Sequence, residues 1–155
     1  MSQVNPIPDG YHSVTPFLYI NGAAEAIDFF KAAFGAEEKG GRAPGPNGTI
    51  MHAEIKIGDS TIMISDALWN PPTQATLHLY VTDANAAWKR ALDAGATVVM
   101  PLADQFWGDR YGSVSDRWGN RWTIGQHNED VSPAEMERRM ADAAKSQASQ
   151  TQPKT

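Results

Sequence analysis

Two stretches of the chain share one order of hydrophobic and polar positions. LYINGAAEAIDFFKAAFGA (18–36) and LYVTDANAAWKRALDAGA (79–96) both open with aliphatic and aromatic residues, which favour a strand. In both, apolar residues then recur every three or four positions, a spacing that places them on one face of a helix. Each stretch therefore predicts a strand followed by an amphipathic helix.

Polar residues and glycines mark the expected ends of these two helices. Asn21 is expected to be the N-cap of the first helix, and Thr82 or Asp83 the N-cap of the second, because a short polar side chain can accept hydrogen bonds from free backbone N–H groups. Gly35 and Gly95 are expected to end the helices, since glycine readily adopts the left-handed conformation found there.

The similarity of the two stretches extends to a longer repeat. Leu18 and Leu79 lie 61 positions apart, and so do Gly58 and Gly119, which begin GDSTIMI and GNRWTIG. Each of these glycines opens a turn that precedes a strand. Two matches at one offset favour a duplicated strand–helix–strand–strand–strand module. The modules are expected at 12–67 and 74–127, with strands at 14–20, 36–42, 49–57 and 60–66 and at 76–82, 97–103, 110–116 and 121–127.

A further helix is expected after the second module. Ser132 and Glu135 match a capping box, and Pro133 occupies the favoured first position of a helix. These signals predict a C-terminal helix at 132–146. The polar residues that follow, 147–155, are predicted to be a disordered tail.

Composition narrows the class of protein. With 155 residues, 41% of them hydrophobic and 20% charged, the chain resembles one ordinary folded domain, expected at 1–131. A net charge of -5 with scattered basic residues argues against nucleic-acid binding. No apolar run approaches the roughly eighteen residues that span a bilayer, so we expect no membrane partner and a cytoplasmic location. The absence of Cys excludes disulfides and thiolate metal sites.

Three segments together resemble a known superfamily: VTPFLYINGAAEAIDFFKAAFGA, MHAEIKIGDSTIMISD and FWGDRYGSVSDRWGNRWTI. They are similar to the glyoxalase/bleomycin-resistance/dioxygenase superfamily, also called vicinal oxygen chelate, and in particular to its PhnB-like branch. The resemblance implies an α+β fold in which two βαβββ modules form one curved mixed sheet around a cavity. It also implies a homodimer.

The resemblance further implies where a metal ion would bind. In metal-dependent members, the first and last strands of each module supply one ligand each. The corresponding positions here are Thr15 and Thr76 on the first strands, and Thr123 and either Ile62 or Met63 on the last. Hydroxyl and aliphatic side chains are poor ligands for a divalent metal, so no cofactor is expected at this place.

A relocated metal site is the alternative. His52 and Glu54 lie two residues apart on one predicted strand and so share a face. His78 is expected to share the cavity-facing side of Thr76. Two imidazoles and a carboxylate are a donor set of open zinc or iron sites, and without a metal His78 and Glu54 could act as acid and base. Otherwise His52 and Glu54 face solvent or pair with neighbours, and His78 is a hydrogen-bonded cavity residue.

The segment QFWGDRYGSVSDRWGNRWTI (105–124) concentrates rings, charges and glycines. Trp107 and Tyr111 are suited to a pocket wall, and Arg110 could bind a carboxylate or phosphate. Asp109 could hold that guanidinium or another residue in place. The alternative is a surface loop with a structural Asp–Arg contact and two rings that close the edge of the core.

The second half of that segment has a structural interpretation. Asp116 is expected to anchor the turn at Gly119 and Asn120 through its side chain. Trp122 is expected to pack into the core, while Thr123 beside it faces the cavity.

Three functions are compatible with these features. The first is a metal-free small-molecule-binding protein whose pocket residues are Thr15, Phe17, His52, Thr76, His78, Trp107, Asp109, Arg110, Tyr111 and Thr123. The second is an enzyme of lyase, isomerase or dioxygenase type, which acts on a small oxygenated substrate through His52, Glu54 and His78. The third is a vestigial member that serves as an interaction or regulatory module.

Overall fold

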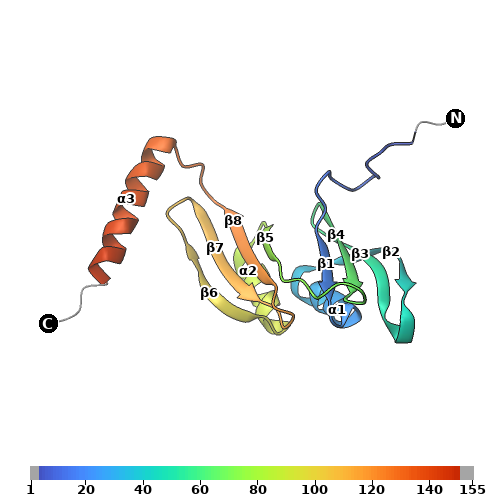
Figure 1. The fold of residues 1–155 in the computed structure, drawn as a ribbon. Helices are drawn as coiled ribbons and strands as arrows, with labels where there is room; N and C mark the ends of the chain where they lie inside the picture. The colour runs from blue at the N-terminus through green and yellow to red at the C-terminus, as the bar shows by residue number, and fades with distance from the viewer. Residues whose placement is uncertain (1–3, 151–155) are drawn as a thin grey trace.

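A computed structural model of the chain describes residues 4–150 and confirms the α+β class with two copies of one module (Figure 1). The first copy contains β1 (Phe17–Ile20), α1 (Ala23–Phe34), β2 (Glu37–Pro44), β3 (Ile50–Ile57) and β4 (Ser60–Asp66). The second contains β5 (Thr76–Tyr80), α2 (Ala84–Asp93), β6 (Thr97–Asp104), β7 (Asp109–Ser115) and β8 (Arg121–His127). The C-terminal helix is α3 (Pro133–Gln150). Every expected strand is present, although β1 is shorter than predicted.

The strands form two mixed four-stranded sheets, ordered β1-β4-β3-β2 and β5-β8-β7-β6. In each sheet the first strand runs parallel to the last strand of its module. This arrangement differs from the one continuous sheet that was expected. The reason lies at the edge of β1, where Tyr19 exchanges hydrogen bonds with Thr73 of the connection between the modules. Because Thr73 occupies these backbone groups, they are not free to pair with β5.

The start of α1 is capped by a side chain from a distant strand. The N-cap residue is Gly22, so the prediction of Asn21 is wrong. The Asp66 carboxylate at the end of β4 accepts hydrogen bonds from the backbone N–H groups of Gly22 and Ala23, each at 3.0 Å. It also accepts the N–H of Ile50 at 2.7 Å. The local pattern failed here because the capping group comes from 44 residues away along the chain.

The start of α2 follows the local pattern. Asp83 is the N-cap, as predicted, and its side chain accepts the N–H of Ala86 at 3.0 Å. Gln126 of β8 acts as the counterpart of Asp66, because its side-chain oxygen accepts the N–H of Ala84 at 2.9 Å. Both modules therefore use the end of the last strand to hold the start of the helix, once with a charge and once without.

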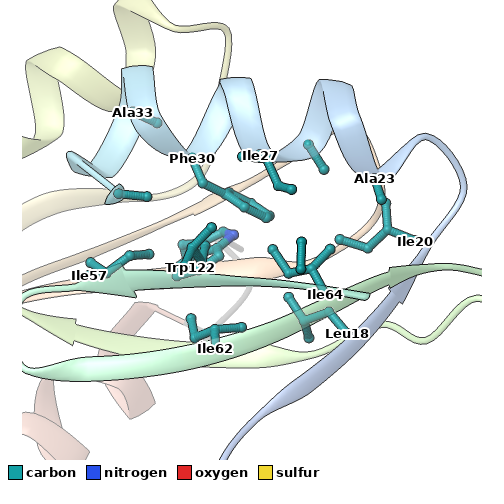
Figure 2. Packing of buried hydrophobic residues seen from close by; sticks show 14 of the residues in the cluster. Leu18, Ile20, Ala23, Ile27, Phe30, Ala33, Ile57, Ile62, Ile64 and Trp122 are labelled. Atoms are coloured by element: carbon teal, nitrogen blue, oxygen red, sulfur yellow. The ribbon is translucent and has the colours of Figure 1, made fainter. Parts of the chain in front are cut away.

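The two modules share one hydrophobic core, in which α1 lies over the first sheet (Figure 2). Trp122 of β8 reaches into this core, where it is 2% exposed. Its ring centre lies 5.2 Å from that of Phe30 and 4.3 Å from that of Phe34. The helices α1 and α2 also pack on each other, and Arg90 of α2 donates hydrogen bonds to two carbonyls near the end of α1. Because Trp122 packs on Phe30 and Phe34, the centre of the junction between the modules is apolar.

The turn between β7 and β8 is built around a buried carboxylate, as the sequence predicted. Asp116 accepts hydrogen bonds from the backbone N–H groups of Trp118 and Asn120 and from the indole N–H of Trp122. This group of bonds holds Trp122 in the orientation that the core requires.

Strand register shows which residues of the two modules correspond. Phe17 pairs with Met63 on the parallel neighbour of β1, and His78 pairs with Thr123 on the parallel neighbour of β5. Of the two candidates for the last-strand position, Met63 is therefore the counterpart of Thr123. Ile62 is 5% exposed and belongs to the core.

The helix α3 begins at Pro133, one residue after the predicted start, and the Ser132 hydroxyl accepts the N–H of Glu135 at 3.3 Å. It continues to Gln150, beyond the predicted end at residue 146, and the rest of the predicted tail, 151–155, lies outside the described residues. None of the described α3 residues is buried, and the helix projects from the second module (Figure 1). Across residues 4–150, no helix combines the length and hydropathy needed to cross a membrane.

Candidate functional site

Within residues 4–150, each sheet has one face on the core, where α1 or α2 packs, and an opposite face that neither of these helices covers. On β8, Trp122 and Ile124 are buried in the core, so Thr123 between them points to the other face. His78 and Ser113 are the register partners of Thr123 and share that face. We call the surface formed by Thr76, His78, Tyr80, Tyr111, Ser113 and Thr123 the second open face. The first open face is the equivalent surface of the first sheet, formed by Phe17, Tyr19, Lys39, His52, Glu54 and Met63.

Aromatic side chains form a continuous row along the second open face. The ring centres of Trp107 and Tyr111 are 5.4 Å apart, and Tyr111 stacks on His78 at 5.8 Å. His78 meets Tyr80 edge-on at 4.3 Å. The structure thus brings together the predicted residues Trp107, Tyr111 and His78. It adds Tyr80, whose position two residues after His78 on the same strand was a signal that the sequence interpretation missed.

The His78 ring is held in place by its neighbours on β8. Its Nδ1 lies 2.7 Å from the hydroxyl oxygen of Thr123. Gly125 leaves room for the ring, because a Cβ at that position would lie 2.8 Å from Cε1 of His78. A hydroxyl partner and a position without a side chain therefore fix the ring at the centre of the aromatic row.

The first open face carries a smaller aromatic group. Phe17 stacks on Tyr19 at 4.8 Å between ring centres and meets His52 edge-on at 5.7 Å. Nε2 of His52 lies 3.2 Å from Oε1 of Glu54. The predicted residues Phe17, His52 and Glu54 are therefore neighbours, and Tyr19 joins them.

Tyr11, which the sequence did not single out, lies beside Glu54. Its hydroxyl is buried and makes no hydrogen bond of regular geometry within the described residues. Burial, together with the nearby Glu54 carboxylate, raises the pKa of Tyr11 to about 12. The Tyr11 hydroxyl and then His52 lower the pKa of Glu54, although burial opposes them. Glu54 is thus a stabilised carboxylate and a weaker base than an isolated one.

The contact between Asp109 and Arg110 that the sequence suggested is not formed. Asp109 is 5% exposed, and its carboxylate lies 2.7 Å from Nδ1 of His127. Arg110 instead donates hydrogen bonds to Asn85 at 2.9 Å and Asp104 at 3.1 Å. Neighbouring residues of a strand point to opposite faces, which separates the two side chains. Arg110 therefore already has partners on the helix side of the sheet.

Two predicted pocket residues make no ring contact in the aromatic rows, although Thr76 belongs to the second open face. The Thr15 hydroxyl donates to the carbonyl of His12 at 3.1 Å. Thr15 precedes β1 and lines a hollow of about 280 Å³ at one end of the first sheet. Thr76 is exposed at the start of β5, opposite Arg121.

A larger hollow of about 560 Å³ lies between the two modules. Its lining contains none of the predicted site residues and consists of Glu25, Asp28, Phe29, Ala94, Gly95, Arg117 and Trp118. An ion pair joins Arg117 to Glu25 across this hollow. We therefore place the candidate site on the open faces, where the predicted residues gather.

The residues do not fit a divalent metal centre. Within 4–150, no three His, Cys, Asp or Glu side chains are placed to bind one metal ion. His52 and Glu54 adjoin on β3, whereas His78 lies on the other sheet against Thr123. The alternative in which these three donors converge is therefore wrong for a single chain, because His78 contacts Thr123, Tyr80 and Tyr111 rather than His52 or Glu54.

Fold and site together define a protein of two fused βαβββ modules with ring-lined open sheet faces. The chain belongs to the glyoxalase/bleomycin resistance protein/dioxygenase superfamily, whose family model matches residues 10–124. It is 43% identical over 141 residues to the uncharacterized protein Rv0887c of Mycobacterium tuberculosis, which covers 83% of this chain and 82% of that protein. Membership of the superfamily was expected from the sequence and is confirmed.

Solved structures share this fold. The PhnB protein from Bacillus cereus matches with a TM-score of 0.57 and 23% identity, over 74% of this chain and 99% of that one. TnmS3, an antibiotic binding protein from Streptomyces sp. CB03234, matches with a TM-score of 0.59 and 21% identity, over 76% of this chain and 98% of that one. The predicted likeness to PhnB-like proteins is therefore confirmed, at the level of the fold.

Proposed function

We propose that this chain is a small-molecule-binding protein that holds its ligand against the aromatic residues of its open faces without a metal ion. The row of Trp107, Tyr111, His78 and Tyr80 carries this proposal, because neighbouring rings offer a stacking surface for a planar ligand. His78 and Tyr80 are exposed, and Trp107 and Tyr111 are half-buried. TnmS3, an antibiotic binding protein, shares the fold, which supports the proposal by analogy only. The cytoplasmic location and the absence of a nucleic-acid partner stay predictions.

Binding is better supported than catalysis at these residues. A general base works best when its pKa is close to the working pH. Tyr11 and His52 instead lower the pKa of Glu54, so its carboxylate is further from that condition than an ordinary one. His78, the other residue predicted to act in catalysis, contacts Thr123, Tyr80 and Tyr111 rather than Glu54.

Replacing Tyr111 by alanine should weaken the binding of an aromatic probe. The change removes the middle of the ring row, and a ring pair contributes about 0.5–1.5 kcal/mol, which corresponds to roughly 2- to 12-fold in Kd. Fluorescence titration with 8-anilinonaphthalene-1-sulfonate measures this loss, with and without a chelator. Trp69→Ala is the matched control, because Trp69 is 75% exposed and lies outside the row. Equal effects of the two variants, or loss of binding in the chelator, would contradict the proposal.

A homodimer is the second part of the proposal. Phe17 is 39% exposed and Tyr80 64%, so an aromatic side chain on the open face of each sheet meets solvent in a single chain. Pairing of two copies would cover them and enclose a ligand against an open face. Light scattering during gel filtration is expected to report twice the 16.9 kDa of one chain. A single-chain mass at micromolar concentration would contradict this.

A further inference from the structure

The segment after β8 lies directly against the loop that carries Trp107. The backbone N–H groups of Asn128 and Glu129 donate to the carbonyl of Gly108 at 3.0 and 3.1 Å. Gly108 has a φ of +99°, and a Cβ there would clash with the backbone of Glu129. We call residues 128–131, which connect β8 to α3, the strap. Only a glycine allows the strap to lie this close to the loop.

His127 ties the strap to β7. Its Nδ1 lies 2.7 Å from the buried carboxylate of Asp109, and its Nε2 lies 2.8 Å from the carboxylate of Asp130 in the strap. A carboxylate only accepts hydrogen bonds, so both ring nitrogens must donate, and only the protonated imidazole can do so. The contacts with Asp130 and then Asp109 raise the pKa of His127.

Arg139 of α3 forms a second tie to the same loop. Its side chain is 25% exposed, and one terminal nitrogen donates to the carbonyl of Phe106 at 3.2 Å. Its two terminal nitrogens also bind the Glu129 carboxylate at 2.9 and 2.8 Å. The remaining nitrogen, Nε, donates to Glu135 at 2.8 Å. A fork-shaped pair of this kind fixes geometry as well as charge.

We propose that His127 and Arg139 are positioning residues, which hold the strap and α3 against the loop and thereby set the Trp107 ring at the edge of the second open face. Trp107 contacts Phe106 at 5.1 Å and Tyr111 at 5.4 Å, so a shift of the loop moves the end of the ring row. The effect of such a shift on ligand binding rests on the proposed function. Its effect on the position of the Trp107 ring does not.

When His127 loses its second ring proton, it can no longer hydrogen-bond both Asp109 and Asp130. A neutral imidazole has one N–H, which can serve only one of the two carboxylates. Asp109 is buried and keeps the donor, whereas Asp130 is fully exposed and can exchange it for water. The other charged groups of this region are also paired: Arg139 binds both Glu129 and Glu135, and Arg138 binds Glu135 as well. The pKa of His127 is raised above 6.5. Both hydrogen bonds of His127, to Asp109 and to Asp130, are therefore present below pH 6.5, and the pair is lost as the pH rises through the raised value.

NMR of the ligand-free full chain tests the role of His127. The indole N–H signal of Trp107, assigned with Trp107→Phe, is expected to shift with pH along the same curve as the His127 imidazole. In Asp130→Asn and His127→Gln this pH-dependent shift should be lost, while His12→Gln should keep it. Asp130 is fully exposed, so its replacement leaves the fold intact. A Trp107 signal that ignores pH in the natural chain, or titrates unchanged in Asp130→Asn, would overturn the proposal.

A matched pair of arginines tests the second tie. Arg139→Gln should move the Trp107 signal at every pH, because it removes the bond to the carbonyl of Phe106. Arg138→Gln should not, since within residues 4–150 the Arg138 side chain binds Glu135 and Asp142, which both lie on α3 itself. Equal effects of the two variants would refute a positioning role for Arg139. These measurements need no ligand, so a failure of probe binding and a failure of the ties are distinguishable.

Discussion

Replacing Trp122 by alanine is expected to lower the free energy of unfolding by about 3–5 kcal/mol. Trp122 is 2% exposed and packs on Phe30 and Phe34 of the other module, so the change leaves a cavity where the modules join. It also removes the indole donor from the buried carboxylate of Asp116. Urea unfolding followed by circular dichroism measures the loss. Since many domains have only about 5–15 kcal/mol of stability, the variant should be close to unfolding at physiological temperature.

Trp69→Ala is the control for this prediction. Trp69 is 75% exposed in the connection after β4, and its removal should change the free energy of unfolding by no more than about 0.5 kcal/mol. If the two variants lose similar stability, Trp122 does not join the modules. An independent response of each module to urea in the natural chain would also contradict the shared core.

The second large effect is expected from Asp66→Asn. The Asp66 carboxylate accepts three backbone N–H groups, those of Gly22, Ala23 and Ile50, while an amide presents an NH₂ group to at least one of them. We expect a loss of about 2–3 kcal/mol, because a buried N–H loses a charged acceptor. Urea unfolding at pH 7 measures this loss. Asp59→Asn, a change at the turn before β4, should cost no more than about 0.5 kcal/mol.

The same carboxylate makes stability depend on acid. Burial alone raises the pKa of Asp66, but the three backbone donors outweigh it, and the pKa is lowered. A group with a lowered folded-state pKa stabilises the fold above its ordinary value, here 3.8. This contribution is lost as the pH falls through the folded-state value, below 3.8. In Asp66→Asn, the free energy of unfolding should depend less on pH in this acidic range. If it fell with pH as steeply as in the natural chain, the role of Asp66 would be contradicted.

The two modules illustrate how far local patterns reach. The N-cap of α2 was predicted correctly because Asp83 acts on Ala86, three residues away. The N-cap of α1 was not, because Asp66 reaches Gly22 from the end of β4. At α2 the capping side chain comes from a residue close in sequence, which a local pattern can identify. At α1 it comes from a strand that only the sheet topology brings to the start of the helix.

The candidate site divides in the same way. Residues on one strand could be grouped from the sequence, as His52 and Glu54 were, since alternate positions share a face. Residues on different strands were harder to group, because the sequence does not show which strands become neighbours. The alternative of a relocated metal site grouped His78 with His52 and Glu54, but strand pairing places His78 beside Thr123. His127 carried no signal, because its partners Asp109 and Asp130 meet it only through the β7–β8 pair and the strap.

The sequence by itself determined the strands, the helices, the duplication and the superfamily, because periodicity, turn residues and repeated segments are local properties of a chain. The tertiary structure decided that the strands form two sheets, since Thr73 occupies the free edge of β1. It also decided that Trp107, Tyr111, His78 and Tyr80 form one row, since this depends on which strands become neighbours. Contacts between distant residues depend on the packing of the whole chain, and no window of sequence contains that information.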